Sequence, residues 1–225
     1  TLDENRRQRK DQIMEELYDK SDFRIHQLCK EKAPLSRFML SPQQLTCSGK
    51  IELMQSLLQK LHAEGHRVLI FSQMTRVLDI LQEVLGLWGY EHLRLDGSTP
   101  VATRQDLIDR FNNDDQVFIF LLSTRAGGVG INLTTADTVI FYDIAFNPQV
   151  DRQAEDRCHR FGQEKPVTIY KLITSRTVDQ NMLQMAERKA KLNDIMLEEG
   201  SKKRDQTKVW QLRSLLSSVF EEIQQ

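Results

Sequence analysis

The sequence has few cysteines, no long apolar run and almost no net charge, and each shortage excludes a class of protein. Its three cysteines, Cys29, Cys47 and Cys158, are odd in number and widely spaced, which favours a reducing compartment over a disulfide framework or a zinc site. Apolar runs are no longer than a handful of residues, as at 117–122, so we expect no contact with a membrane. The net charge of −1 gives no general attraction to nucleic acid, so any basic surface must be local.

The sequence also lacks the elements that hold a nucleotide and its metal ion. A Walker A loop around Ser48-Gly49-Lys50 would need a glycine at the position of Gln44. No Asp-Glu pair follows a predicted strand, so we assign no metal ligand. The glycines at 127, 128 and 130 depart from the spacing of a dinucleotide-binding fingerprint, which counts against a stand-alone Rossmann-like enzyme with a small cofactor.

The sequence does contain a regular alternation of strand-like and helix-like segments. Its 225 residues suit one α/β domain of about 130–150 residues with appendages. Short apolar runs predict strands at 67–71, 91–95, 117–122, 138–142 and 167–172. Amphipathic helices are predicted between them, and Gly65 and Gly89 stop the first two. We further expect Thr99 and Thr177 to cap helices.

This alternation predicts an α/β fold with a parallel sheet, right-handed crossovers and helices on both faces. We expect four segments: a peripheral helical linker or insertion, the α/β lobe, a long helix that packs on or braces it, and a basic link with a short amphipathic helix. Their boundaries are 1–44, 45–175, 176–200 and 201–225. Because the first residues already read as helix, we expect the chain to be part of a longer protein.

Polar loops follow the predicted strands at 96–99 and 123–132, and a third unusual segment, 153–163, lies on the helix after another strand. In parallel sheets, the loops at the carboxyl ends of the strands form the ligand crevice. In the second loop, three glycines allow a close approach to phosphate, and Thr124 and Arg125 add a hydroxyl and a charge. The alternative for this loop is a tight structural turn.

Two arginines in the third segment lie on one face if the segment is helical. Gln153, Arg157 and Arg160 fall at i, i+4 and i+7. Two guanidiniums side by side repel each other unless a polyanion lies opposite, and a triphosphate in its transition state is such a polyanion. The alternative is a solvated helix whose acidic residues within 151–156 neutralise the arginines.

Four segments in order resemble the C-terminal helicase motifs of Swi/Snf-type chromatin-remodelling ATPases. They are VLIFSQ at 68–73, RLDGST at 94–99, STRAGGVGINL at 123–133 and QAEDRCHRFGQ at 153–163. The resemblance covers roughly residues 45–197, and the segments 22–29 and 151–160 are most similar to the SMARCA-containing DEAD/H-box subfamily. Gln163 stands where RNA helicases typically have arginine, which favours movement along duplex DNA without strand separation.

The resemblance implies a RecA-like second lobe that closes on ATP with Mg²⁺, held mainly by an N-terminal lobe that is absent from this chain. Arg157 and Arg160 would be arginine fingers, and Gln153 would help hold their helix at the nucleotide. Gly130 and Asn132 would lie at the cleft between the lobes, near the nucleotide. Without the first lobe, this chain alone is expected to hydrolyse no ATP.

The resemblance further implies contacts with the DNA backbone. The residues concerned are Gly97, Ser98, Ser123, Thr124, Arg125, Gly127, Gly128 and Phe146. Phe146 departs from the family, which often has tryptophan after an aspartate there, whereas this chain reads Ala145-Phe146. The implied protein is a nuclear, DNA-dependent ATPase that moves on duplex DNA and slides or remodels nucleosomes. The alternative is a catalytically silent DNA- or histone-binding module of helicase-like fold.

Overall fold

A computed structural model of the chain describes residues 2–126, 132–145, 150–151 and 165–199. The chain divides into two compact units, Thr1–Glu52 and Leu53–Gln225. The first unit is helical, as its sequence predicts, and contains α1 (Leu2–Tyr18), α2 (Asp22–Lys30), the 3-10 helix η1 (Ala33–Phe38) and α3 (Pro42–Thr46).

Side-chain caps define the helix starts in the first unit. Ser21 accepts the Arg24 N–H at the start of α2 over 3.3 Å. Ser41 and Gln44 form a reciprocal capping box at the start of α3. The buried His26 accepts the Leu40 N–H through Nδ1 over 3.0 Å, which fixes the chain between η1 and α3 to α2.

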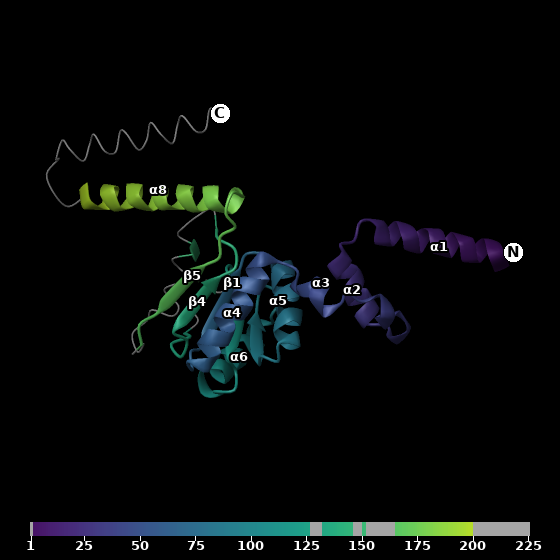
Figure 1. Cartoon of the computed structure of the whole chain (residues 1–225), viewed down its shortest axis with the longest axis horizontal. Helices are drawn as coiled ribbons and strands as arrows, with labels where there is room; N and C mark the ends of the chain where they lie inside the picture. Colours follow the sequence, from purple (N-terminus) through teal and green to yellow (C-terminus); the bar gives the residue numbers. More distant parts are fainter. Residues whose placement is uncertain (1, 127–131, 146–149, 152–164, 200–225) are drawn as a thin grey trace, which may run out of the picture. The chain divides into compact units, whose positions relative to one another are not determined.

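The second unit is built on a parallel five-stranded sheet in the order β2-β3-β1-β4-β5. Figure 1 labels β1, β4 and β5 of this sheet. Its strands are β1 (Val68–Ser72), β2 (His92–Leu95), β3 (Ile119–Ser123), β4 (Thr138–Phe141) and β5 (Thr168–Lys171). All five predicted strands are confirmed within one or two residues at each end. In the centre of the sheet, Val68 is in register with Ile119 on one side and Thr138 on the other.

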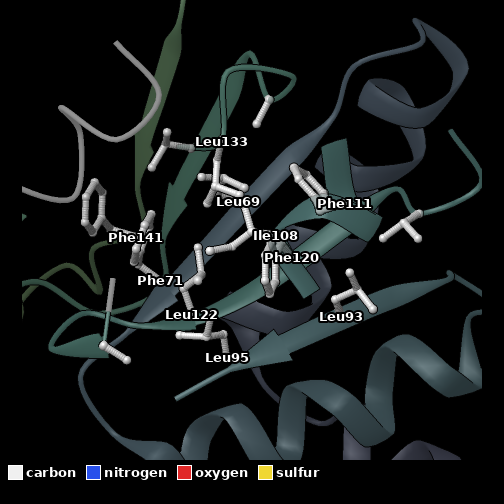
Figure 2. Close-up of a cluster of buried hydrophobic side chains, with 14 of the residues drawn as sticks. Leu69, Phe71, Leu93, Leu95, Ile108, Phe111, Phe120, Leu122, Leu133 and Phe141 are labelled. Carbon is white, nitrogen blue, oxygen red and sulfur yellow. The ribbon is translucent and has the colours of Figure 1, made fainter. Parts of the chain in front are cut away.

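Helices cover both faces of this sheet, as the apolar strands predicted. Apolar side chains of α4 (Gly49–Ala63) and α5 (Thr75–Leu87) pack with Ile119 and Leu121 on one face. On the other face, α6 (Val101–Asn113) packs Ile108 and Phe111 with Phe120 and Leu122. Figure 2 shows this second cluster, in which the rings of Phe111 and Phe120 lie 5.2 Å apart. The side chains of β3 therefore alternate between two cores, which fixes the register of this strand.

The last helix among the described residues, α8 (Val178–Glu199), joins the core on the α6 face of the sheet. Its half-buried Met182 and Leu183 pack against that cluster. Thr177 caps it, because its hydroxyl accepts the Asp179 N–H over 3.2 Å, so this predicted cap is confirmed. Among the described residues, no helix is both long and apolar enough to cross a membrane.

The predicted stops at Gly65 and Gly89 are confirmed, whereas the predicted cap at Thr99 is wrong. Both glycines have positive φ, +74° and +76°, and end α4 and α5 with the left-handed turn that glycine adopts without strain. Thr99 instead accepts the Asp96 N–H over 3.0 Å, and α6 begins at Val101 after Pro100, without a side-chain cap. The hydroxyl is therefore used to close the turn before the helix.

Candidate nucleotide and DNA interface

The polar loops predicted to form the site leave the sheet at the same edge. Because the sheet is parallel, the carboxyl ends of β1, β2, β3 and β4 lie together, with Ser72 in register with Ser123 and Leu95 with Leu122. The loops after β2 and β3 are therefore neighbours, and they begin with Asp96 and Thr124. The prediction that these two loops leave the same edge of the sheet is confirmed for the described residues.

The loop after β2 is held from inside by Asp96. This carboxylate is almost fully buried and accepts the Ser98 N–H over 2.8 Å, the Ser98 hydroxyl over 2.6 Å and the Arg94 Nε–H over 2.8 Å. Gly97 and Ser98 are exposed at the tip, and nothing lies within 4 Å of the place where a Gly97 Cβ would be. The loop therefore presents rigid backbone with open space over Gly97.

Arg94 supplies the charge that keeps Asp96 ionised. Its guanidinium also bonds to Asp79 of α5 over 2.7 Å, so it joins the loop to that helix. Burial alone would raise the pKa of Asp96, but hydrogen bonds from Ser98 and Arg94 outweigh it and hold this pKa below its ordinary value. Burial opposes the charge of Arg94 too, yet its bonds to Asp79 and Asp96 raise its pKa on balance. Each ion stabilises the other's charged form.

The loop after β3 carries one exposed cation over a buried turn. The Ser123 hydroxyl accepts the Ala126 N–H over 3.3 Å, and the Thr124 N–H donates to the Ser72 carbonyl over 3.0 Å. Ser123 and Thr124 are both buried, whereas Arg125 is exposed. Within the described residues, the buried Thr124 hydroxyl has no hydrogen-bond partner. Such a group is an available donor and acceptor at the base of this loop.

Asp143, just after β4, ties this edge together and was missed as a functional residue from sequence. Its carboxylate accepts the Ser72 hydroxyl and, over 2.8 Å, the Gln73 N–H. The Gln73 amide in turn donates to the Ile144 carbonyl. In the sequence, Asp143 follows a predicted strand, but isoleucine rather than glutamate comes after it, so it does not fit the Asp-Glu pattern of a magnesium ligand. Its position directly after a buried strand was the signal for a role at this edge.

Several predicted site residues lie outside the residues that the structure describes. They are Gly127, Gly128, Gly130, Phe146, Gln153, Arg157 and Arg160. Asn132 is described: its side chain is exposed, and its carbonyl accepts the Asn112 Nδ2–H over 3.0 Å. The buried Asp151 accepts the Ala145 N–H over 3.3 Å, which holds residue 151 next to the end of β4. In the described part of the chain, no three His, Cys, Asp or Glu residues could hold a metal ion together.

The sequence matches the family described as helicase conserved C-terminal domain over residues 49–162. It is 52% identical over 191 residues to Protein CHROMATIN REMODELING 19 of Arabidopsis thaliana, covering 84% of this chain and 25% of that protein. It is 54% identical over 181 residues to the SWI/SNF-related matrix-associated actin-dependent regulator of chromatin subfamily A containing DEAD/H box 1 homolog of Drosophila melanogaster. That match covers 80% of this chain and 21% of the relative. The chain thus spans a quarter or less of these proteins.

A solved structure supports the same grouping. The chain is similar to the crystal structure of the C-terminal part of the Fun30 ATPase domain, with a TM-score of 0.77 and 46% identity. This similarity covers 79% of the chain and 58% of the solved one. The parallel sheet described above is therefore of the RecA-like kind found in the C-terminal lobe of helicases.

Proposed function

Because the chain belongs to the helicase conserved C-terminal domain family of SWI/SNF-related chromatin remodellers, we propose that it is the second motor lobe of a DNA-dependent ATPase. The complete protein would move along duplex DNA in the nucleus and slide or remodel nucleosomes. We assign the lobe itself to residues 45–175, with the preceding helices and the flanking segments 176–200 and 201–225 as appendages.

One observation carries the DNA-binding half of this proposal. The loops after β2 and β3 lie side by side at the carboxyl edge of the sheet and offer exposed Gly97, Ser98 and Arg125. A backbone N–H, such as that of Gly97, and an arginine can contact phosphate without reading sequence, whereas the Ser98 N–H and hydroxyl already donate to Asp96. Asp96 and Arg94 hold the first loop in one conformation. Phosphate binding therefore does not have to order this loop, which lowers the entropic cost of binding.

Ser123, Thr124, Gly127 and Gly128 complete the DNA-binding set in this proposal, together with Phe146. Ser123 and Thr124 are buried and act by shaping the turn that presents Arg125. The unpartnered Thr124 hydroxyl supports a ligand close to the base of the loop.

The ATP-binding half rests on Arg157 and Arg160. As arginine fingers they would stabilise the charge that develops on the transferred phosphoryl group. Gln153, Gly130 and Asn132 would line the same side of the cleft. ATP with Mg²⁺ would be held mainly by the N-terminal lobe of the same protein, and it supplies the free energy that closes and reopens the two lobes. This chain alone would therefore be inactive.

The phosphate contact is tested by the salt dependence of DNA binding in the full-length protein. Arg125→Gln is expected to weaken binding to any duplex sequence and to reduce the slope of log K against log salt by about 1. Lys60→Gln is the matched control, because it removes one exposed positive charge from the last turn of α4, at the amino-terminal edge of the sheet. Equal slopes for Arg125→Gln and the wild type would refute the assigned contact.

A further inference from the structure

A cavity of about 640 Å³ lies at the amino-terminal edge of the sheet, opposite the loops of the proposed DNA interface. Glu91 and Phe118, which line it, directly precede β2 and β3, and the Glu91 carbonyl accepts the Phe118 N–H over 3.1 Å. The left-handed turn at Gly89 places Tyr90 and Glu91 there, since the Tyr90 N–H returns to the Leu85 carbonyl over 3.1 Å. The cavity is thus built from fixed backbone.

Aromatic rings form one wall of this cavity. The ring centroids of His62 and Phe118 lie 4.7 Å apart, those of Tyr90 and Phe118 5.2 Å, and those of His62 and Tyr90 5.4 Å. The half-buried Trp88 lines the same cavity. Because the three rings already touch one another, no group can enter between them. A ligand would instead lie against their outer surface.

The electrostatics of the cavity favour a cation. Its charged side chains are two carboxylates, Glu91 and Asp114, and one guanidinium, Arg110, which lies 2.9 Å from the first and 3.5 Å from the second. Three helices also end around it: His62 is in the last turn of α4, Trp88 follows α5, and Arg110 is in the last turn of α6. Helix carboxyl termini carry partial negative charge, which adds to the excess carboxylate.

We propose that this cavity binds an arginine side chain from an extended segment of a partner protein. A guanidinium is flat enough to stack on the aromatic wall and presents a fork of N–H donors to a carboxylate. A lysine ammonium has the charge but neither the plane nor the fork. The site is separate from the carboxyl-edge loops, so it goes beyond the proposed function and would dock a partner while DNA is bound.

The binding test compares an arginine with its neutral isostere in the 225-residue chain. The probes are acetyl-Gly-Arg-Gly-amide and the same peptide with citrulline, which keeps the shape and loses the charge. We expect the arginine peptide to shift the NMR signals of the Trp88 indole and the His62 ring. Its affinity should be about tenfold or more above that of the citrulline peptide, with the lysine peptide between them. Equal binding of arginine and citrulline peptides, or no binding of either, would overturn the proposal.

Charge variants test whether the carboxylates of the cavity bind a ligand or only form ion pairs with Arg110. Glu91→Gln should weaken the arginine peptide several-fold, whereas Glu187→Gln, which removes an exposed carboxylate from α8, should not. Arg110→Gln frees both carboxylates and should tighten binding. If neither Glu91→Gln nor Arg110→Gln changes the affinity, the carboxylates serve only Arg110 and the proposal fails. The three substituted side chains are exposed, and thermal melts verify that each variant folds. DNA binding by the full-length protein should be unchanged in Glu91→Gln.

Discussion

The backbone N–H of Gln73 donates a 2.8 Å hydrogen bond to the carboxylate of Asp143, which lies 70 positions further along the chain. The Ser72 hydroxyl donates to the same carboxylate, so two donors at the end of β1 share one acceptor that follows β4. This relationship fixes the carboxyl edge of the sheet, where the loops of the proposed site begin.

Asp143→Asn should therefore loosen this edge. An asparagine keeps one acceptor oxygen but puts an NH₂ group opposite a donor, so one of the two hydrogen bonds is lost. We expect the free energy of unfolding to fall by about 1–3 kcal/mol. Urea titration measures this loss, and Asp106→Asn on the exposed surface of α6 is the matched control. Identical urea midpoints for Asp143→Asn and Asp106→Asn would show that the bonds are not needed for stability.

The ionised state of Asp96 makes stability depend on pH. Its pKa in the folded chain lies below the ordinary value of 3.8, because the bonds from Ser98 and Arg94 outweigh the effect of burial. Its contribution is therefore fully present above the ordinary value and is lost as pH falls through the lower, folded pKa. The unfolding free energy of the wild type should decline over this acid range more steeply than that of Asp96→Asn. Parallel pH profiles from urea titrations would contradict this assignment.

Arg67 joins the start of β1 to the end of α6. Its guanidinium lies 4.3 Å from the centroid of the Phe111 ring and donates to the carbonyls of Asp114 over 3.1 Å and Val117 over 2.9 Å. Burial lowers the pKa of Arg67, although nearby aspartates oppose this effect.

A lysine has no planar guanidinium to lie over the Phe111 ring while it donates to the carbonyls, so Arg67→Lys should lower the free energy of unfolding by about 1–3 kcal/mol. Arg76→Lys changes an arginine side chain that is 74% exposed and should have little effect. Chemical denaturation of both variants tests the difference. Equal losses in the two variants would mean that the carbonyl contacts of Arg67 do not contribute.

At Gly89, the cost of a left-handed backbone for a residue other than glycine can be measured without a steric clash. Gly89 has φ +76°, and Gly86 lies inside α5, yet a Cβ at either position would meet nothing within 4 Å. Gly89→Ala should therefore lose about 1–2 kcal/mol through backbone strain alone. Gly86→Ala should gain up to about 1 kcal/mol, because alanine favours the helix. Thermal or urea unfolding that moves both variants in the same direction would be inconsistent with the observed turn.

The sequence was sufficient to predict the elements of the lobe but not their order in the sheet. Unbroken apolar runs such as 117–122 marked strands covered on both faces, and Gly65 and Gly89 marked helix ends. The order β2-β3-β1-β4-β5 depends on crossovers that periodicity along the chain does not encode. Helix capping was predicted for Thr99 because of its place in the sequence, but its hydroxyl closes the preceding turn.

The sequence predicted the candidate site only where the site residues are consecutive in one loop. The loops that begin with Asp96 and Thr124 contain glycines and hydroxyls in sequence and were found directly. Asp143 and Arg67 bond to partners 70 and 44–50 positions away, so a local pattern can mark a position such as that of Asp143 after a strand but does not reveal these partners. The cavity near Tyr90 likewise forms only when three helix ends meet at one edge of the sheet.

In the proposed function, Arg157 and Arg160 complete an ATPase site carried by another part of the protein. The most direct test of this claim is DNA-stimulated ATP turnover by the full-length protein with Arg157→Ala or Arg160→Ala. Arg152→Ala is the control, since residue 152 is off the face predicted for residues 153, 157 and 160. We predict that each finger variant loses about 10³-fold or more in turnover and that the control keeps it. Turnover within a few-fold of the wild type in both finger variants would contradict this claim and favour a catalytically silent binding module.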